Sequence, residues 1–171
     1  MAKNTLLQNK VLVEEKKLAD QLTSKGYGER KGKQVVLDLK EALYLLEGKK
    51  IEIVDEKGKK IGEKKLREHA QAREARFYSK YTVYKDLRER GYCTKTGFKF
   101  GFDFRVYPRG KKIGEAHTQW VVKVMTQDDR IGMIPYSRMV RLSQNIRAKL
   151  LIAVVDSEND INYYESERIT P

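Results

Sequence analysis

Residues 98–107 alternate strictly between hydrophobic and polar side chains. The hydrophobic positions are Phe98, Phe100, Phe102, Phe104 and Val106, and the intervening positions are Lys99, Gly101, Asp103, Arg105 and Tyr107. A period of two predicts a β-strand with one face in the core, because successive side chains of a strand point to opposite sides. We therefore place Tyr107 on the polar face, in line with Asp103 and Arg105. The segment Pro-Arg-Gly at 108–110 ends the strand.

A second strand is expected to begin at His117, with Gln119 and Val121 on the same face. A basic loop separates it from Tyr107, and His117 is one of only two histidines in the chain. A tyrosine and a histidine on neighbouring strands are candidates for a general base and a general acid. The ordinary alternative is an aromatic residue at the rim of a sheet beside a hydrogen-bonded histidine.

The rest of the chain predicts two domains of mixed α and β structure. Short hydrophobic runs at residues 6–7, 11–13 and 51–55 predict strands of the first domain. Asp38 and Glu41 have the spacing of a capping box at the start of a helix, and Gly48 has the place of a C-terminal residue with positive φ. We expect a charged connecting helix over residues 63–75. The first domain is thus predicted to span residues 1–76.

The second domain, residues 77–171, is predicted to hold a helix over 78–90, the two strands described above, a helix over 137–150, and strands over 151–156 and 161–165. The fold class is therefore α+β: a small N-terminal α+β domain followed by a C-terminal α/β nuclease-like domain with a mixed central sheet.

Charge points to a polyanionic partner. The chain carries 36 Lys and Arg against 24 Asp and Glu, a formal net charge of +12. Nucleic acid is the commonest such partner, because neutralising phosphates releases counterions; a lysine-rich surface that serves solubility is the alternative. The single cysteine, Cys93, excludes an intramolecular disulfide. No run of eighteen apolar residues occurs and the N-terminus lacks a signal-peptide core, so a cytoplasmic protein without membrane contact is expected.

A metal-dependent nuclease would need clustered carboxylates to hold Mg²⁺. Asp103 is one candidate ligand, but the next strand reads Val121-Val122-Lys123, with no acid before the lysine. We expect Asp103 to pair with a basic neighbour, and we predict no metal site. Cys93 has no histidine near it in sequence, and His69 falls on the charged connecting helix, so neither is expected to serve catalysis.

RNA changes what Tyr107 and His117 could do, because its own 2′-hydroxyl can act as the nucleophile. Cleavage then requires a base near that hydroxyl, an acid near the 5′ leaving oxygen and a cation near the phosphate. This chemistry needs no metal and no other cofactor.

Several segments of the chain resemble a known family. The segments YKDLRERGY, KTGFKFGFDFRVYPRG, HTQWVVKV and MVRLSQNIRAKLLIAVVDSENDINYYE closely resemble the archaeal tRNA-splicing endonucleases (tRNA-intron lyases), and VVLDLKEALYLLEGKKIEIVD resembles their N-terminal domain. The resemblance implies cleavage of precursor tRNA at bulge–helix–bulge junctions, leaving 2′,3′-cyclic phosphate and 5′-hydroxyl ends. It also implies that Tyr107 is the general base and His117 the general acid. The implied assembly is a homotetramer, with a heterotetramer as the alternative.

The family's third catalytic group is a lysine that stabilises the charged phosphate and directly follows the arginine of a V-R-K-K-L-like segment. Here residues 146–150 read IRAKL, so an ungapped alignment puts Ala148 at the lysine's position. Lys149 comes one residue later, which on a helix means about 100° of rotation away. Three explanations stay open: an engineered Lys→Ala substitution, a register shift that makes Lys149 the true lysine, and natural divergence. An engineered alanine would leave this copy without its catalytic lysine, whereas a register shift would leave that lysine in place as Lys149.

Further roles follow from the resemblance. Arg141, seven residues before Ala148 and thus on the same face of the predicted helix, resembles an arginine that grips a bulge base. The acidic turn with Asp156, Glu158 and Asp160 matches a loop by which one protomer docks on another, with residues 128–129 as runner-up and an ordinary solvated turn as the alternative. Residues 161–164 offer apolar edge positions for pairing with a second copy. The rival function is a non-catalytic RNA-binding or assembly subunit of the same complex.

Overall fold

Two units make up the chain, Met1–Phe77 and Tyr78–Pro171. The structure is a computed structural model, and it describes residues 3–96 and 101–171. Predictions for Phe98, Lys99 and Phe100 lie outside the described residues. Across the described ranges, no helix combines the length and apolar character that a membrane span requires.

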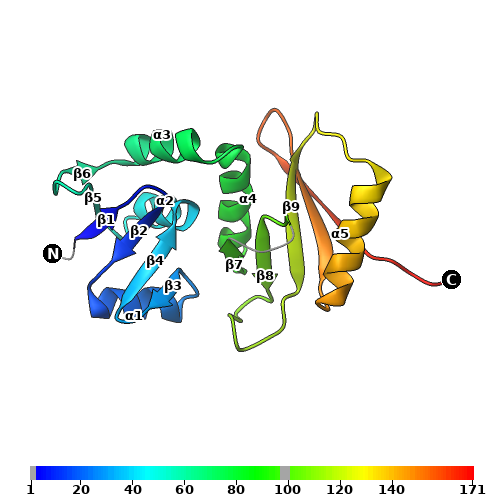
Figure 1. Cartoon of the computed structure of the whole chain (residues 1–171), viewed down its shortest axis with the longest axis horizontal. Helices are drawn as coiled ribbons and strands as arrows, with labels where there is room; N and C mark the ends of the chain where they lie inside the picture. Colours follow the sequence, from blue (N-terminus) through cyan, green and yellow to red (C-terminus); the bar gives the residue numbers. More distant parts are fainter. Residues whose placement is uncertain (1–2, 97–100) are drawn as a thin grey trace. The chain divides into compact units, whose positions relative to one another are not determined.

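The first unit is a six-stranded sheet with three helices. Its strands lie in the order β3-β4-β2-β1-β5-β6, and only β1 and β5 are parallel. The strands are β1 (Asn4–Leu6), β2 (Lys10–Val13), β3 (Glu29–Lys31), β4 (Gln34–Asp38), β5 (Ile53–Val54) and β6 (Lys60–Ile61), and the helices are α1 (Lys16–Ser24), α2 (Leu39–Glu47) and α3 (Glu63–Arg73) (Figure 1). The strands expected near residues 6, 11–13 and 51–55 are present, whereas the sequence patterns that we used did not reveal α1, β3 or β4.

The predicted capping box starts α2. The Lys40 backbone N–H donates to Asp38 Oδ1 at 2.8 Å, and the Asp38 N–H donates to Glu41 Oε2 at 3.0 Å. These two bonds satisfy backbone donors that a helix N-terminus leaves without partners. The expectation of a positive φ at Gly48 is wrong: Gly48 has φ −75°, and Lys49 after it has φ 54°.

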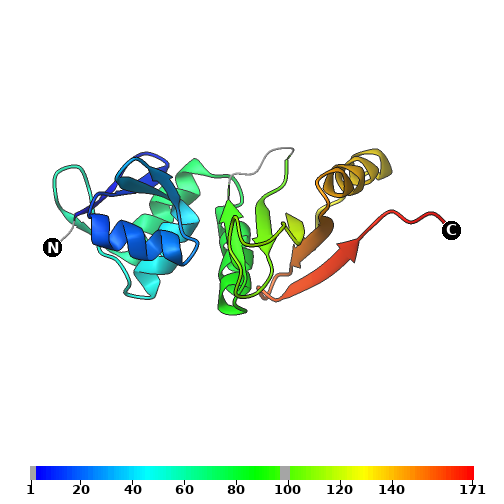
Figure 2. The same cartoon turned by 90° about the horizontal axis from the view of Figure 1, so that it is seen from below.

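The second unit is a five-stranded mixed sheet between two helices. Its strands lie in the order β11-β10-β9-β8-β7; only β9 and β10 are parallel, because α5 connects them across one face. The elements are α4 (Phe77–Glu89), β7 (Cys93–Thr96), β8 (Phe104–Tyr107), β9 (Trp120–Thr126), α5 (Met133–Asn145), β10 (Lys149–Val155) and β11 (Ile161–Ser166). Figures 1 and 2 show α4 on one face of this sheet and α5 on the other. The predicted α+β fold with a mixed sheet is confirmed.

Each face of this sheet has its own core. On the α4 face, the Tyr84 and Phe104 rings pack with centroids 6.0 Å apart. On the α5 face, a buried cluster contains Phe102, Val121, Val140, Ala148 and Leu150. The alternation predicted for β8 holds at Phe104 and Val106, which are fully buried.

Hydrogen bonds tie the edge strand β11 to α4. The Tyr163 hydroxyl donates to Asp86 Oδ2 at 2.6 Å, and Arg90 Nε donates to the same oxygen at 2.7 Å. Burial, and then the bond to Asp86, raise the pKa of Tyr163 far above its ordinary value. The Tyr163 hydroxyl therefore stays protonated and can donate to Asp86.

Candidate active site

Tyr107 is the last residue of β8, opposite Cys93 of β7. Tyr107 was predicted on the polar face of the strand, but only 4 % of its surface is exposed. Arg105, two residues earlier, shares its face because strand side chains alternate. Asp103, by contrast, precedes β8 and accepts a 2.7 Å bond from the Val124 N–H.

His117 lies in a loop and not on a strand, which corrects the sequence-based expectation. We call residues 108–119 the histidine loop; it connects β8 to β9, and β9 begins only at Trp120. His117 is exposed. The loop contains two turns, closed by bonds from the Lys111 N–H to the Pro108 carbonyl (3.0 Å) and from the Glu115 N–H to the Lys112 carbonyl (3.0 Å).

The sheet brings Tyr107 and Ala148 to the same end and the same face. Arg105 and Leu150 both pair with Val121, so all three lie in one row across β8, β9 and β10. Tyr107 is two residues beyond Arg105, and Ala148 is two residues before Leu150 in the buried cluster. Two strand spacings separate β8 from β10, so Tyr107 and Ala148 lie about 10 Å apart across the strands.

Residue 119 joins these two positions to the histidine loop. The Gln119 N–H donates to the Val106 carbonyl at 2.8 Å, and the Lys149 N–H donates to the Gln119 carbonyl at 3.1 Å. His117 is two residues before Gln119, so it lies on the loop close to the residue that bonds to both Val106 and Lys149. The structure thus brings the three sequence-predicted positions to one end of the sheet.

Lys149 faces the opposite side of the sheet from Ala148. We expected both on a helix over 137–150, but α5 ends at Asn145, Arg147 has φ 58°, and β10 starts at Lys149. On a strand, neighbouring side chains point about 180° apart rather than 100°. Lys149 Nζ contacts Glu165 at 2.9 Å and Glu167 at 3.6 Å.

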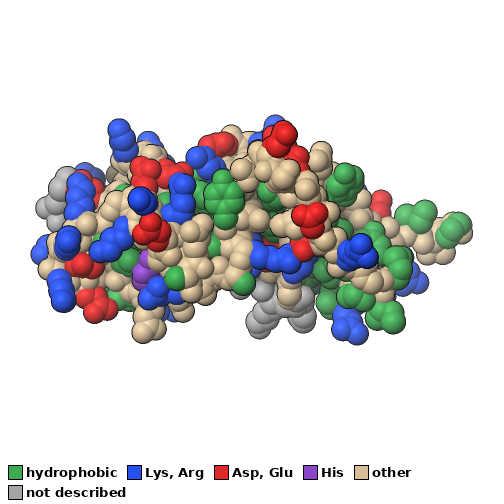
Figure 3. Space-filling view, turned by 90° about the horizontal axis from the view of Figure 1, so that it is seen from above, with side chains coloured by type: hydrophobic (Ala, Val, Ile, Leu, Met, Phe, Trp, Pro, Cys, Tyr) green, Lys and Arg blue, Asp and Glu red, His purple; other side chains and the backbone are tan. Residues whose placement is uncertain are grey.

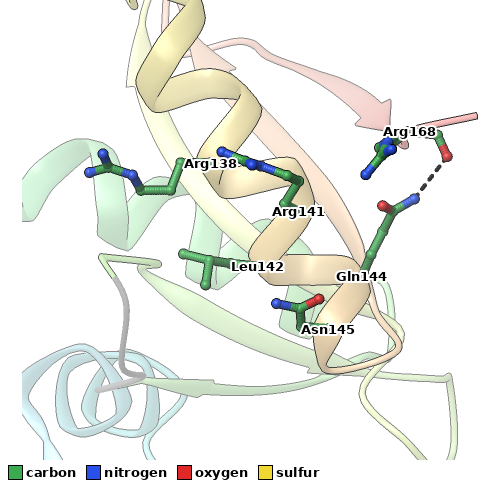
Figure 4. A pocket seen from close by; sticks show the side chains of 6 residues that line it. All are labelled: Arg138, Arg141, Leu142, Gln144, Asn145 and Arg168. Carbon is green, nitrogen blue, oxygen red and sulfur yellow. Dashed lines mark hydrogen bonds between the residues drawn. The ribbon is translucent and has the colours of Figure 1, made fainter.

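An arginine-rich cavity of about 270 Å³ lies beside the C-terminal half of α5. Figure 4 shows Arg138 and Arg141 projecting from α5, with Arg168 approaching from the C-terminal tail. The tail is held there because Gln144 Nε2 donates to the Arg168 carbonyl at 2.8 Å. The remaining lining residues are Leu142 and Asn145. Arg141 therefore lines a cavity, but it shares no helical face with Ala148, since the helix ends between them.

Sequence reasoning missed Arg138 and Arg168. Arg138 and Arg141 are three residues apart, a spacing that places side chains together on a helix, so the sequence did hold a signal for Arg138. Arg168 is brought in by the path of the tail after β11, which no local pattern indicates.

Carboxylates near the site are engaged in the fold. Asp103 Oδ1 lies 3.5 Å from Lys80 Nζ, which confirms the predicted pairing with a basic neighbour. Among the described residues, no group of three or more His, Cys, Asp and Glu is arranged to hold a metal ion. His69 is half-buried, and its Nε2 lies 2.8 Å from the Gln8 carbonyl.

The acidic turn connects β10 to β11. Asp156 Oδ1 accepts the N–H groups of Glu158 (2.8 Å) and Asp160 (2.9 Å), so Asp156 shapes the turn, while Glu158 and Asp160 are exposed. Asp129 accepts the Thr126 N–H at 2.8 Å in the same manner.

Comparison with known proteins decides the family. Residues 77–163 match the tRNA intron endonuclease catalytic C-terminal domain, and residues 2–67 match the tRNA intron endonuclease N-terminal domain. The chain belongs to the tRNA intron endonuclease family.

Relatives within this family align over most of both chains. The tRNA-splicing endonuclease of Methanothermobacter thermautotrophicus is 39% identical over 145 residues, which is 85% of this chain and 84% of the relative. That of Thermococcus kodakarensis is 40% identical over 134 residues (78% and 77%), and that of Pyrococcus furiosus is 36% identical over 165 residues (93% and 91%). Tyr107, His117 and Ala148 all fall within the matched C-terminal domain of the family.

Proposed function

We propose that this chain is an endonuclease subunit that cleaves precursor tRNA at bulge–helix–bulge intron junctions without a metal ion. The products are a 2′,3′-cyclic phosphate and a 5′-hydroxyl. The convergence of Tyr107, His117 and residue 148 at one end of a sheet, in a member of the tRNA intron endonuclease family, carries the proposal. Residues 77–171 are the catalytic domain, and residues 1–76 are the N-terminal domain.

Each group has one role in this proposal. Tyr107 takes the proton of the attacking 2′-hydroxyl, and the 2′-oxygen forms a bond to phosphorus as the bond from phosphorus to the 5′-oxygen breaks. His117 gives a proton to the departing 5′-oxygen. A general base and a general acid each contribute roughly 10²–10⁴-fold in rate. An exposed histidine on a loop suits a group that must approach a bulky RNA substrate.

Residue 148 is the position of the phosphate-stabilising cation, and alanine there leaves the transition-state charge without this partner. We propose that the activity of this copy is impaired for that reason. An engineered and a natural alanine have the same physical consequence. Lys149 does not replace the cation, because it faces the other side of the sheet and is paired with Glu165.

The test is end-group analysis after incubation of the Ala148→Lys variant with a bulge–helix–bulge RNA in EDTA. Cyclic phosphate and 5′-hydroxyl ends support the proposal. A requirement for Mg²⁺, or 3′-hydroxyl ends, refutes it. If the variant binds the RNA but the RNA stays intact, the rival function of a non-catalytic RNA-binding subunit is correct.

Arg141 is proposed to bind RNA in the arginine-rich cavity, with Arg168 beside it. Arg141→Ala should weaken binding of the uncleaved RNA by about tenfold, the lower end of what loss of one base-stacking contact costs. Arg141→Lys should restore little, because an ammonium keeps the charge but not the planar stacking surface. Arg130→Ala, an exposed arginine outside the cavity, is the matched control. If a filter-binding titration shows the same loss of RNA affinity for Arg130→Ala and Arg141→Ala, then Arg141 contributes only its charge and no specific base contact.

Assembly into a homotetramer is proposed to use the C-terminal unit. Within the described part of the chain, every exposed large hydrophobic side chain lies at residues 78–171, and Met133, Ile134 and Tyr164 are 71, 75 and 57 % exposed. Figure 3 shows hydrophobic side chains among charged ones on this unit. Tyr164 lies on β11, an edge strand that a second copy could extend.

The acidic turn is proposed as a second contact between protomers. The double change Glu158→Gln and Asp160→Asn removes two exposed charges and keeps Asp156, which shapes the turn. We expect the dissociation constant of the assembly to rise about tenfold, because charge pairs across interfaces steer and stabilise docking. Light scattering over a dilution series measures it, with Glu56→Gln, a change at an exposed acid of the first unit, as control. If the double variant has the same molar mass as the parent chain at every concentration, the turn does not contribute to the interface.

A further inference from the structure

Both ends of the histidine loop contact one aromatic ring. Arg109, near the start of the loop, places its guanidinium carbon 5.0 Å from the centre of the Tyr92 ring. Trp120, directly after the loop, packs edge-on against the same ring with centroids 5.3 Å apart and an interplanar angle of 66°. Both geometries are favourable, the first as a cation–π contact and the second as a T-shaped aromatic pair.

The Trp120 side chain also bonds to the edge strand β11. Its indole N–H donates to Glu165 Oε2 of β11 at 2.8 Å, and the other carboxylate oxygen, Oε1, accepts from Lys149 at 2.9 Å. The bond from Trp120, and then the bond from Lys149, lower the pKa of Glu165 below its ordinary value. A charged carboxylate is therefore present as the acceptor at neutral pH.

We infer that Tyr92 and Glu165 are positioning residues that hold the two ends of the histidine loop together and so fix where His117 stands. The inference rests on the proposed function of His117 as the general acid. Tyr92 fixes the loop ends relative to each other, and Glu165 fixes the Trp120 end relative to β10 and β11. Lys149 supports Glu165, which gives it a role distinct from that of a phosphate-binding cation.

Loop ends matter here because His117 is exposed. Backbone bonds of Gln119 restrain the chain two residues after His117, whereas on the other side the strand pairing stops at Tyr107, ten residues before His117. A general acid must come within hydrogen-bond reach of the leaving oxygen. A displacement of about 1 Å in such a group costs on the order of 10²-fold in rate.

Two matched pairs of variants isolate these contacts. Tyr92→Ala removes the ring, whereas Tyr92→Phe keeps it and loses only the hydroxyl. Glu165→Ala removes the acceptor for the indole N–H, whereas Glu165→Gln keeps an amide oxygen for that bond but loses the charge and the second acceptor, which bonds to Lys149. The thermal transition of each variant, followed by circular dichroism, shows whether the fold is retained.

The chain offers two readouts that require no catalysis. Arg109, Lys111 and Lys112 are trypsin sites within the histidine loop. The second readout is the NMR signal of His117, with the only other histidine, His69, as internal reference. Tyr92→Ala and Glu165→Ala should speed tryptic cutting of the loop about tenfold and broaden or shift the His117 signal but not that of His69. Tyr92→Phe should resemble the parent chain, and Glu165→Gln should lie closer to the parent than Glu165→Ala, because it keeps the acceptor for Trp120.

Kinetics then link the loop to the reaction. In the Ala148→Lys background, Tyr92→Ala should lower kcat about 10- to 100-fold with KM unchanged, and Tyr92→Phe should restore kcat. Unchanged trypsin cutting and His117 signals in Tyr92→Ala and Glu165→Ala would overturn the inference, as would equal changes at His69. Failure of the Ala148→Lys variant to cleave RNA would refute the proposed function instead, since the loop measurements do not depend on cleavage.

Discussion

Replacing Ala148 by lysine is expected to raise the rate of bulge–helix–bulge cleavage by about 10²–10³-fold, the usual effect of one group that stabilises transition-state charge. Residue 148 shares a sheet face with Tyr107, and the loop that carries His117 is bonded to the chain beside it through Gln119. The new ammonium would therefore reach the space in front of the same end of the sheet. Single-turnover cleavage with saturating protein in EDTA measures the rate.

The lysine must also fit. Ala148 is 5 % exposed within the α5-side core, so its replacement costs roughly 1–3 kcal/mol of stability unless the aliphatic stem runs along the cluster and carries the ammonium to water. Ala148→Met adds a comparable stem without the charge and should cost similar stability without gain in rate.

The register alternative has its own control. If Lys149 were the catalytic cation, Lys149→Met would abolish the residual cleavage of the parent chain. We expect instead that adding Lys149→Met to the Ala148→Lys variant changes its cleavage rate by no more than about threefold. Glu165 still accepts the indole N–H of Trp120 when Lys149 is absent. A large loss in Lys149→Met would contradict the assignment of residue 148.

Loss of the acid or the base is expected to have the largest negative effect. In the Ala148→Lys background, His117→Ala and Tyr107→Phe should each lower the cleavage rate by about 10²–10⁴-fold with little change in RNA affinity, because in the proposed mechanism both groups act on protons that move in the transition state. The rates come from single-turnover kinetics and the affinities from titration with a substrate that carries a 2′-deoxynucleotide at the cut site.

A modified substrate separates the two roles. A bridging sulfur in place of the 5′ leaving oxygen departs without protonation, so it should largely restore the rate of His117→Ala and not that of Tyr107→Phe. His69→Ala is the control, since His69 belongs to the first unit and bonds to Gln8. Rescue of both variants, or of neither, would contradict the assignment of His117 as the acid.

Local sequence patterns predicted much of this fold. They failed where the ends of an element depend on pairing with a strand that is distant in the sequence. The capping box of α2 is a local signal that the structure confirms, whereas the predicted alternation holds at Phe104 and Val106 but not at Phe102, which packs on the α5 face. The predicted start of β9 was wrong because alternation on one strand does not reveal where its partner ends. Here β8 ends at Tyr107, since Pro108 lacks an N–H, and the register pairs stop at Val106 with Trp120.

The helix predicted over 137–150 shows the same limit at the site itself. Its hydrophobic spacing continues through Ile146, which packs against the α5-side core although α5 has ended. The turn there uses a positive φ at Arg147, so no glycine or proline marks it in the sequence. The orientation of Lys149 could therefore be determined only from the structure.

The start of β10 has a practical consequence. Because residues 148 and 149 project to opposite faces, a change of charge at 148 leaves the ion pair that anchors β11 intact. On the proposed function, a chain with alanine at 148 keeps its fold and the arginines proposed to bind RNA, and only the chemical step is slowed. If the proposal holds, the equilibrium affinity for an intact precursor with its natural 2′-hydroxyl can be measured with this protein before any bond is broken.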